Sequence, residues 1–258
     1  MILVFGGTTE GRKTATLLEG MGLPFIYSTK TKIDFSETEN SRYRYGILEG
    51  KELSEYLEKE NIKLIINAAH PFAKILHENI ARVAEIRKIP VLRFGRKILP
   101  RQEHHLVSYV DSYEEAISLF DPQKKLWALT GVQSIILLKS WWLKQPTFFR
   151  ILDRPESLAM AKGFGFPESQ LILGLTSNKV TEEISLVKKH QIGMLLTKET
   201  GNSGFLNTKI QVALQMNIPI IIIKSPEISD TFEQVFSTET LKTHLENSSY
   251  CFTNKLNR

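Results

Sequence analysis

Short runs of apolar, often β-branched residues alternate along the chain with longer amphipathic stretches. The first run, 2–5, predicts a buried strand, and the stretch 10–21, whose apolar side chains recur near one face, predicts a helix. Further strands are predicted at 24–28, 43–48, 64–68, 91–94, 106–110, 126–129, 147–152, 171–173, 193–196 and 219–224. Further helices are predicted at 52–60, 73–88, 112–120, 132–139, 156–162, 180–190, 206–216 and 231–245. This alternation is typical of an α/β fold with mainly parallel sheets flanked by helices.

The alternation is interrupted at residues 95–105. This segment reads GRKILPRQEHH; it is basic, contains a proline and shows no periodicity, so we expect a linker there. Two α/β domains of similar style are then predicted, over 1–98 and 99–246, with a polar tail at 247–258. In such an arrangement we expect a ligand in the cleft between the domains.

Composition narrows the class of protein. Of the 258 residues, 42% are hydrophobic and 24% are charged, which is ordinary for a globular protein and excludes extensive disorder. The 33 Lys and Arg against 28 Asp and Glu leave a net charge of +5, which is too small and scattered to favour nucleic acid but suits an anionic small ligand. The single cysteine, Cys251, excludes a disulfide framework within the chain and a cysteine-based metal cage, and we expect no metal site.

From the sequence we expect neither a membrane span nor a signal peptide. No apolar run approaches the roughly 18 residues of a membrane span. The first residues, MILVF, follow no basic stretch of the kind that opens a signal peptide. We therefore expect a cytoplasmic protein with no membrane or nucleic-acid partner, present as a monomer or a weak homo-oligomer.

The first predicted strand runs directly into GGTTEGR at 6–12, and a helix follows. A turn of this kind directs backbone N–H groups and the positive end of the helix dipole towards an anion such as a phosphate. Compared with the dinucleotide fingerprint G-x-G-x-x-G, the outer glycines match and Thr8 stands in place of the middle one. The alternative is a tight strand-to-helix turn without a ligand.

The end of the second predicted strand bears on the type of dinucleotide. Folds that bind NAD usually have an acidic residue there, which accepts hydrogen bonds from the ribose hydroxyls. Here the strand runs into STKTK at 28–32, and the first carboxylate is Asp34. Hydroxyls and lysines such as Ser28 and Lys30 suit a 2′-phosphate, which favours NADPH over NADH. The alternative is that the lysines belong to a solvated loop.

A histidine lies at the end of the strand predicted at 64–68, in the segment NAAHPFA. Pro71 suits the first turn of a helix, which places His70 at the carboxyl end of the strand, the edge of an α/β sheet that usually faces the ligand. His70 could hydrogen-bond a nicotinamide, a ribose or a substrate carbonyl, and the alternative is a capping or packing role. We expect His77, seven residues further along, to lie on the surface.

A second polar, glycine-rich segment, TKETGNSG at 197–204, follows another predicted strand. Lys198, together with Lys209 in the next helix, could clamp an acidic substrate when the glycine-rich loop closes, and the alternative is a flexible surface loop. A similar but weaker turn, LTG at 129–131, also ends a strand. Arg150 lies in an otherwise apolar strand, so an inward-pointing side chain there needs an anionic partner.

Taken together, these motifs resemble the precorrin-6A reductase family of corrin (vitamin B12) biosynthesis, including its cobalt-precorrin-6A relatives. The similar segments occur in the same order, from residue 1 to around residue 226. They are ILVFGGTTEGR, NAAHPFA, IPVLRF, LTG and LTKETGNSGFLNTKI followed by IPIIII. Each segment alone is unspecific, but the combination of the opening, His-Pro and TKETG segments is specific.

The resemblance implies NADPH-dependent reduction of a double bond in precorrin-6A to give precorrin-6B, by two Rossmann-like α/β domains with the cofactor on the first. The implied cofactor loop holds Gly6, Gly7, Thr8, Thr9, Glu10 and Arg12, to which the strand-end argument adds Ser28 and Lys30. His70, Pro71 and Phe72 fall beside the cleft, and Lys198, Glu199, Gly201 and Lys209 fall in the substrate-side loop. Arg93, Arg96 and Arg150 are further candidates for the carboxylates of a tetrapyrrole substrate. We expect Lys198 to bind a carboxylate or assist proton delivery, and His70 to shape the site.

The sequence also departs from the family pattern. STKTKID replaces a small-residue segment that ends in Gly-Arg, RFGRK lacks the acid of an R-x-E-R-like run, and Gly174-Leu175-Thr176 replaces a G-P-F segment. These differences bear on cofactor preference and substrate contacts more than on the fold. Two alternatives therefore stay open: another NADPH-dependent reductase or epimerase, and a non-catalytic binding module that senses a dinucleotide.

Overall fold

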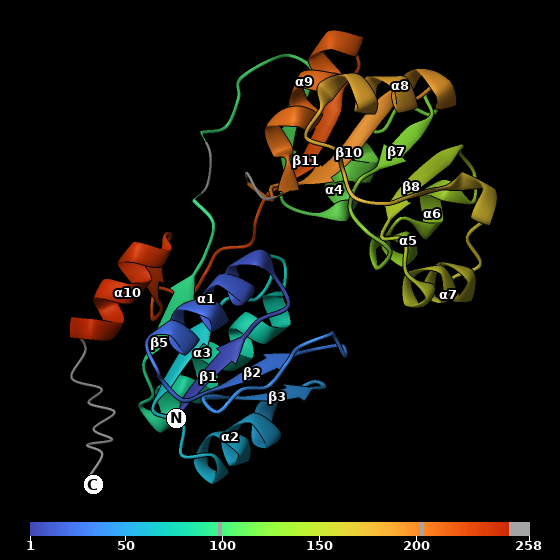
Figure 1. Cartoon of the computed structure of the whole chain (residues 1–258). Helices are drawn as coiled ribbons and strands as arrows, with labels where there is room; N and C mark the ends of the chain where they lie inside the picture. Colours follow the sequence, from blue (N-terminus) through green and yellow to red (C-terminus); the bar gives the residue numbers. More distant parts are fainter. Residues whose placement is uncertain (98–99, 202–203, 248–258) are drawn as a thin grey trace, which may run out of the picture. The chain divides into compact units, whose positions relative to one another are not determined.

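The computed structural model describes residues 1–97, 100–201 and 204–247, and the structural statements below concern these residues (Figure 1). The chain forms two compact units. The first contains Met1–Lys97 and the chain from Pro226 onward, and the second contains the intervening residues up to Ser225. Parts of the predicted linker, of the TKETGNSG loop and of the polar tail with Cys251 lie outside the described residues.

The first unit is built on a six-stranded parallel sheet. Its strand order is β12-β5-β4-β1-β2-β3. The strands are β1 (Ile2–Phe5), β2 (Phe25–Thr29), β3 (Ser41–Tyr45), β4 (Leu64–Asn67), β5 (Val91–Phe94) and β12 (Glu233–Val235). The four residues of β1 are all buried, as expected for a central strand covered on both faces.

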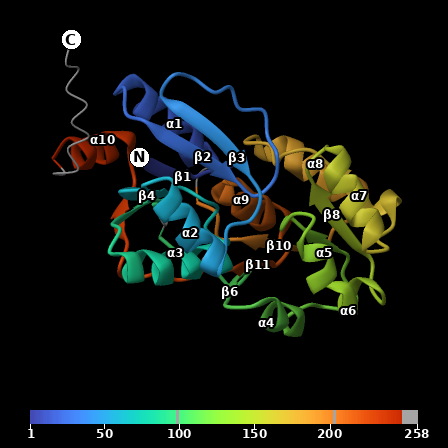
Figure 2. The ribbon, with the colours of Figure 1, turned by 90° about the horizontal axis from the view of Figure 1, so that it is seen from below.

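Helices cover both faces of this sheet, α1 (Thr9–Gly20) and α10 (Thr238–Asn247) on one face and α2 (Gly50–Lys59) and α3 (Lys74–Arg87) on the other (Figure 2). Alternate residues of β1 point to opposite faces, so Ile2 packs with the first pair of helices and Leu3 with the second. The apolar stripes of these helices therefore enclose the strands in two separate layers of core.

The end of the chain differs from the expectation. We predicted a helix over 231–245 within the second domain, but Glu233–Val235 forms β12, which pairs with β5 of the first unit, and α10 begins only at Thr238. Val235 and Leu241 are completely buried in the first unit. The first unit therefore takes its sixth strand from the segment that follows the second unit.

The second unit is also built on a six-stranded parallel sheet, with the order β6-β11-β10-β7-β8-β9. Its strands are β6 (Val107–Val110), β7 (Leu126–Ala128), β8 (Thr147–Ile151), β9 (Leu171–Leu173), β10 (Met194–Lys198) and β11 (Ile220–Ile223). Its helices are α4 (Tyr113–Ser118), α5 (Ser134–Leu137), α6 (Lys139–Trp142), α7 (Pro155–Gly163), α8 (Val180–His190) and α9 (Leu206–Met216), with a short 3₁₀ turn at Glu168–Gln170. The single helix predicted at 132–139 is thus two short helices, α5 and α6.

In each sheet the strand order reverses at one point, between β1 and β4 in the first unit and between β7 and β10 in the second. The loops that follow two such strands run in opposite directions, which leaves a crevice at their carboxyl ends where ligands of open α/β sheets bind. The first unit has the strand order of a dinucleotide-binding fold. Its glycine-rich turn and the NAAHPFA segment flank the first reversal, and the LTG and TKETG segments flank the second.

We predict that Leu241→Ala destabilises the first unit by about 2–5 kcal/mol, because α10 buries this side chain completely in the core. Urea unfolding followed by circular dichroism measures the change. Lys242→Ala is the matched control, since Lys242 is exposed on the same helix. Equal stability of the Leu241 variant and the wild type would contradict the assignment of this segment to the first unit.

Candidate functional site

The turn between β1 and α1 is packed tightly against Tyr27 of β2. The hydroxyl of Tyr27 accepts a hydrogen bond from the Gly7 N–H at 3.0 Å. A side chain at Gly6 would overlap the Tyr27 ring, and Gly7 has a φ of +87°, which L side chains rarely adopt. Gly6 is therefore required by the close approach of the turn to this ring, and Gly7 by its left-handed backbone conformation.

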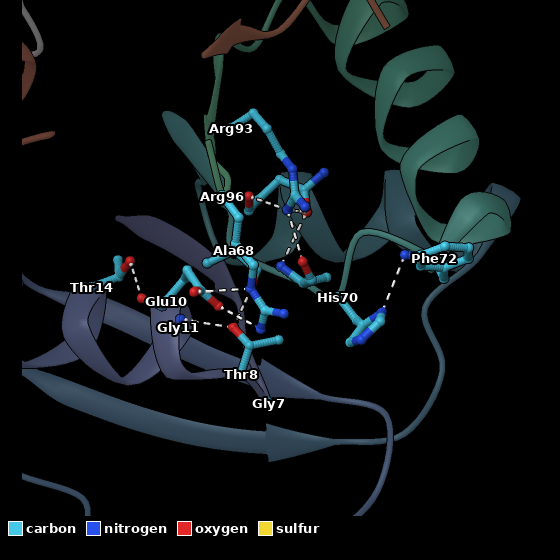
Figure 3. Close-up of polar contacts among 12 residues, drawn as sticks. Gly7, Thr8, Glu10, Gly11, Thr14, Ala68, His70, Phe72, Arg93 and Arg96 are labelled. Atoms are coloured by element: carbon cyan, nitrogen blue, oxygen red, sulfur yellow. Dashed lines mark hydrogen bonds and ion pairs between the residues drawn. The ribbon is translucent and has the colours of Figure 1, made fainter. Parts of the chain in front are cut away.

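Thr8 explains the departure from the glycine fingerprint (Figure 3). It is the N-cap of α1, and its hydroxyl accepts a hydrogen bond from the Gly11 N–H at 3.0 Å. The same hydroxyl donates to the Ala68 carbonyl at 2.6 Å, directly after β4. A threonine at this position thus both caps the helix and links the two strands at which the sheet order reverses.

The remaining geometry of the turn fits a pyrophosphate. The first N–H groups of any α-helix have no acceptor within the helix, and the helix dipole adds positive potential at this end. The Thr8 hydroxyl accepts from the Gly11 N–H and the Tyr27 hydroxyl accepts from the Gly7 N–H, while Thr9 is exposed at the turn. Exposed backbone amides at a helix N-terminus, next to a glycine with no side chain to block an approach, are the usual cradle for a phosphate group.

Glu10 and Arg96 form an ion pair beside this turn (Figure 3). Arg96 donates from Nε to one carboxylate oxygen of Glu10 and from a terminal nitrogen to the other, each at 3.0 Å. Both side chains are largely buried. The pair ties the first turn of α1 to the segment that follows β5. Glu10, predicted from the sequence to be in the cofactor loop, is therefore in place next to the turn and neutralised by Arg96.

A buried hydrogen-bond network holds the segment that carries His70. Arg93 of β5 donates to the Asn67 side-chain oxygen at 3.1 Å, so the Asn67 amide nitrogen faces His77 and donates to its Nδ1 at 3.0 Å. The protonated Nε2 of His77 then donates to the His70 carbonyl at 3.0 Å. These contacts fix the backbone after β4 from three elements: β4, β5 and α3.

The prediction that His77 lies on the surface is wrong. His77 lies in α3 and its side chain is buried. Burial is the larger cause, and the positive charge of Arg93 the smaller, that lowers the pKa of His77 from 6.5 to about 4. His77 is therefore neutral at physiological pH. No local sequence pattern signals this contact, because Asn67 and Arg93 approach His77 only in the folded protein.

His70 itself is exposed at the carboxyl edge of the sheet. Its Nδ1 accepts a hydrogen bond from the Phe72 N–H at 3.2 Å (Figure 3), which places a ring proton on Nε2. Arg93, by contrast, is buried and also donates to the carbonyls of Asn67 and Ala69, at 2.7 and 2.9 Å. Arg93 is thus built into the network beneath the loop, although the sequence suggested a contact with substrate.

The end of β2 also differs from the expectation in its details. Ser28 is buried, and its hydroxyl accepts a hydrogen bond from Arg44 of β3 at 2.6 Å. Lys30 and Arg12 are exposed. Arg44 was not anticipated from the sequence, because the alternating pattern SRYRY of β3 indicates only a strand with one solvated face.

In the second unit, the strand reversal brings together Lys198, at the end of β10, and the segment after β7. Lys198 is half-buried, its Nζ lies 5.9 Å from the centre of the Tyr113 ring, and burial lowers its pKa from 10.5 to about 8. After β7, the Thr130 and Ser134 hydroxyls are 2.6 Å apart, and Gly131 has a φ of +83°. An ammonium group that titrates close to neutral pH therefore lies at the edge where a ligand is expected.

Two further basic side chains of this unit, Lys209 and Arg150, are buried behind that edge. Lys209 donates to the Thr197 hydroxyl at 3.1 Å, and burial lowers its pKa to about 8. Arg150 donates to Glu183 at 2.7 Å and to the Leu175 carbonyl at 3.1 Å. The expectation of an anionic partner for Arg150 is met by Glu183. Both cations bind groups of the protein itself, so the structure gives no support to a direct contact between them and the substrate.

Glu199 connects the loop after β10 to the ends of the second unit. Arg101 donates to both of its carboxylate oxygens, at 2.9 and 3.2 Å, and the Ser225 N–H donates at 2.9 Å. Glu199 is buried, and Gly201 follows with a φ of +64°. Glu199 therefore fixes the loop to the two segments by which the chain enters and leaves the unit, while Lys198 stays at its edge.

Comparison with known proteins decides the family. Residues 1–246 match the family model described as "Precorrin-6x reductase CbiJ/CobK". The chain belongs to this family. The resemblance stated from the sequence is thereby confirmed. The expected α/β fold is confirmed by the two parallel sheets described above. Members of the precorrin-6x reductase family are oxidoreductases, for which a dinucleotide cofactor is implied.

Relatives of the family match the chain over most of its length. The cobalt-precorrin-6A reductase of Methanothermobacter thermautotrophicus is 26% identical over 242 residues, which cover 91% of this chain and 80% of the relative. The precorrin-6A reductase of Rhodococcus erythropolis is 28% identical over 240 residues, covering 91% and 92%. A solved structure of CobK precorrin-6A reductase shares the fold, with a TM-score of 0.78 at 20% identity over 95% of this chain and 96% of that one. Within the described residues, no helix combines the length and apolar character needed to cross a membrane.

We predict that Gly11→Ala destabilises the first unit by about 1–3 kcal/mol and weakens dinucleotide binding, since the new methyl group would lie 2.7 Å from the Gly6 Cα and 2.8 Å from the Tyr27 hydroxyl. Gly20→Ala is a control on the same helix, because no atom lies within 4 Å of the methyl group there. Thermal unfolding and fluorescence titration with NADPH compare the two variants. Identical behaviour of the two would show that the turn tolerates side chains at Gly11.

We predict that His77 makes the stability of the first unit depend on pH between about 6.5 and about 4. The unfolded chain takes up a proton in this range but the folded protein does not, so the free energy of unfolding falls as the pH falls, by at most about 3 kcal/mol. His77→Gln removes the titrating group. Urea unfolding at a series of pH values should give a flatter profile for this variant, and an unchanged profile would refute the buried, neutral state of His77.

Proposed function

We propose that this member of the family reduces a ring double bond of precorrin-6A, or of its cobalt form, to the 6B form with NADPH. The observation that carries the proposal is the position of two complementary groups at the two strand reversals. The first unit offers a glycine turn that fits a pyrophosphate, and the second offers a half-buried ammonium group suited to a polycarboxylate. Relatives named for both forms of the substrate match most of the chain, which supports the substrate class.

In the first unit, the turn after β1 would hold the cofactor. The amides at the start of α1 bind the pyrophosphate, and the Thr8 bridge to Ala68 keeps the two sides of the crevice at a fixed separation. His70 would donate from Nε2 to a carbonyl, amide or hydroxyl oxygen of the bound ligand above the sheet edge. The Arg93–Asn67–His77 network positions His70 through its backbone.

Reduction of a ring double bond requires a hydride and a proton. NADPH, when bound, supplies the hydride from C4 of its nicotinamide and leaves as NADP⁺. Lys198 is protonated for the most part at neutral pH, because its pKa of about 8 lies just above that range. It can therefore bind a substrate carboxylate or deliver the proton at the carbon that becomes saturated.

The choice of NADPH rests on the chemistry at the ends of β2 and β3. The position where an NAD-binding fold has its carboxylate is Ser28 here, and its neighbour across the sheet is Arg44. Lys30 adds positive charge in the loop that follows. Positive charge at these strand ends favours a 2′-phosphate. A ribose 2′-hydroxyl would find no carboxylate acceptor among Ser28, Lys30 and Arg44.

We predict that the protein oxidises NADPH when it is given precorrin-6A or cobalt-precorrin-6A, measured by the loss of the reduced-nicotinamide absorbance, and that NADH is a poorer donor. Turnover of another carbonyl or double-bond substrate but neither tetrapyrrole would favour the broader reductase or epimerase class. Tight NADPH binding without turnover of any substrate would favour a sensing module.

For the same reaction, we predict that Lys198→Ala lowers kcat/KM for the tetrapyrrole at least about tenfold, as expected when a charge-assisted hydrogen bond is removed, without changing the affinity for NADPH. Activity of the wild type should fall as the pH rises through about 8, because Lys198 then loses its proton. Lys198→Arg keeps the charge and should abolish that fall, and Lys189→Ala on the exposed face of α8 is the control. Wild-type rates for Lys198→Ala would remove Lys198 from the site.

A further inference from the structure

Arg44 stands in line with the glycine turn across three neighbouring strands. Phe5, the last residue of β1, pairs in register with Ser28 of β2, which in turn pairs with Arg44 of β3. The Gly6 N–H donates to the Ser28 carbonyl at 2.9 Å, so the turn begins directly beside this row. With neighbouring strands about 4.8 Å apart, the backbone of Arg44 lies about 10 Å from that of Phe5, at the same edge of the sheet.

The guanidinium group of Arg44 is held in a defined position. One terminal nitrogen donates to the Ser28 hydroxyl at 2.6 Å, the other donates to the Tyr45 carbonyl at 3.1 Å, and the central carbon lies 5.4 Å from the centre of the Tyr56 ring. Ser28 is buried, so its hydroxyl is a fixed acceptor. An arginine whose rotamer is set in advance loses less conformational entropy when it binds an anion.

The charge of Arg44 has no carboxylate partner among the residues that the structure describes. Its neighbour on the same strand, Arg42, pairs with Glu60, but no ion pair is formed by Arg44 within this part of the chain. Arg44 is only partly buried, which leaves room for a ligand to reach it. A cation that is fixed by neutral groups and has no ion pair of its own attracts an anion from solution.

The fold indicates which anion would reach this place. In a dinucleotide-binding sheet whose pyrophosphate lies on the first turn, the adenosine ribose lies over the end of the second strand, where a carboxylate selects NAD and an arginine accommodates the 2′-phosphate of NADP. Ser28 occupies the carboxylate position here, and the arginine comes from the adjacent strand. The planar guanidinium fork matches phosphate oxygens better than a lysine ammonium group does.

We propose that Arg44, held by Ser28, binds the 2′-phosphate of the adenosine ribose and is the residue that selects NADPH over NADH. This inference rests on the proposed function, because it requires a dinucleotide on the glycine turn. It replaces Lys30, the residue that the sequence favoured for this role. Lys30 is exposed beyond the end of β2, while Arg44 is fixed at the strand ends themselves.

The test uses two nucleotides that differ in the 2′-phosphate alone, adenosine 2′,5′-bisphosphate and adenosine 5′-monophosphate. Calorimetric titration of the full chain should show that the wild type binds the bisphosphate at least about tenfold more tightly, the expected contribution of a charge-assisted hydrogen bond. Arg44→Gln should abolish this difference and leave the affinity for the monophosphate unchanged, which also shows that the variant is folded. Arg44→Lys should retain part of the preference, and Lys30→Ala should retain most of it.

The two possible failures can be distinguished. The assignment of Arg44 would be overturned, and the proposed function would stand, if Arg44→Gln kept the full preference for the bisphosphate over the monophosphate. Loss of that preference in Lys30→Ala alone would have the same consequence. Failure of the wild type to bind either nucleotide or NADPH would overturn the proposed function, and the inference with it. In steady-state assays with a tetrapyrrole substrate, Arg44→Gln should have a higher KM for NADPH than the wild type and the same KM for NADH.

Discussion

A single reversal of strand order in each parallel sheet determines where the chemistry of this protein can lie. All strands of a sheet point the same way, so their carboxyl ends form one edge, and only at the reversal do neighbouring loops diverge and leave room for a ligand. In the first unit the reversal brings the turn after β1 to the segment after β4, and in the second it brings the loop after β10 to the turn after β7. The polar residues that we propose for the function lie at these two places, although they are far apart in the sequence.

Both edges are supported by buried polar groups rather than by apolar packing alone. Placing a charged or polar side chain in the interior is costly unless its hydrogen bonds are satisfied. Asn67 and His77 behind the first edge, and Glu183 and Arg150 behind the second, form hydrogen bonds with each other and with neighbouring backbone groups, while the Arg150 Nε and one Glu183 carboxylate oxygen have no hydrogen-bond partner within the described part of the chain. Such networks do little for stability compared with an apolar core, but they fix loop conformations. Fixed loops of this kind suit the proposed function, in which a cofactor and a substrate must be held in a defined orientation for reaction.

Much of this arrangement could be predicted from the sequence, because it depends on local patterns. The apolar runs and turn residues predict the order of most strands and helices within the two units, and the strand-to-turn step at GGTTEGR predicts the turn between β1 and α1. The position of Lys198 at the end of a strand was predictable because polar, glycine-rich residues follow an apolar run there. The strand β12 was missed because it has three residues, of which Glu233 and Gln234 are exposed, so no alternating apolar pattern marks it.

The remaining features depend on tertiary contacts that one sequence does not display. Arg93 and Glu199 have the residue types expected at a substrate site, but their partners, Asn67 and Arg101, lie 26 and 98 residues away. Arg44 lies on an edge strand, where a basic residue usually faces solvent, and only the register with Ser28 reveals its position. Thr8 departs from the glycine motif, and the hydrogen bond that explains it, to the Ala68 carbonyl, joins residues 60 positions apart in the sequence.

Hydrogen exchange measured by mass spectrometry with and without NADPH tests most directly whether the turn after β1 is the cofactor site. Backbone amides that bind a pyrophosphate exchange more slowly, so we expect increased protection of the peptide that covers residues 5–12 when NADPH is present. Unchanged exchange in this peptide, under conditions where NADPH is shown to be bound, would place the cofactor elsewhere and contradict the account.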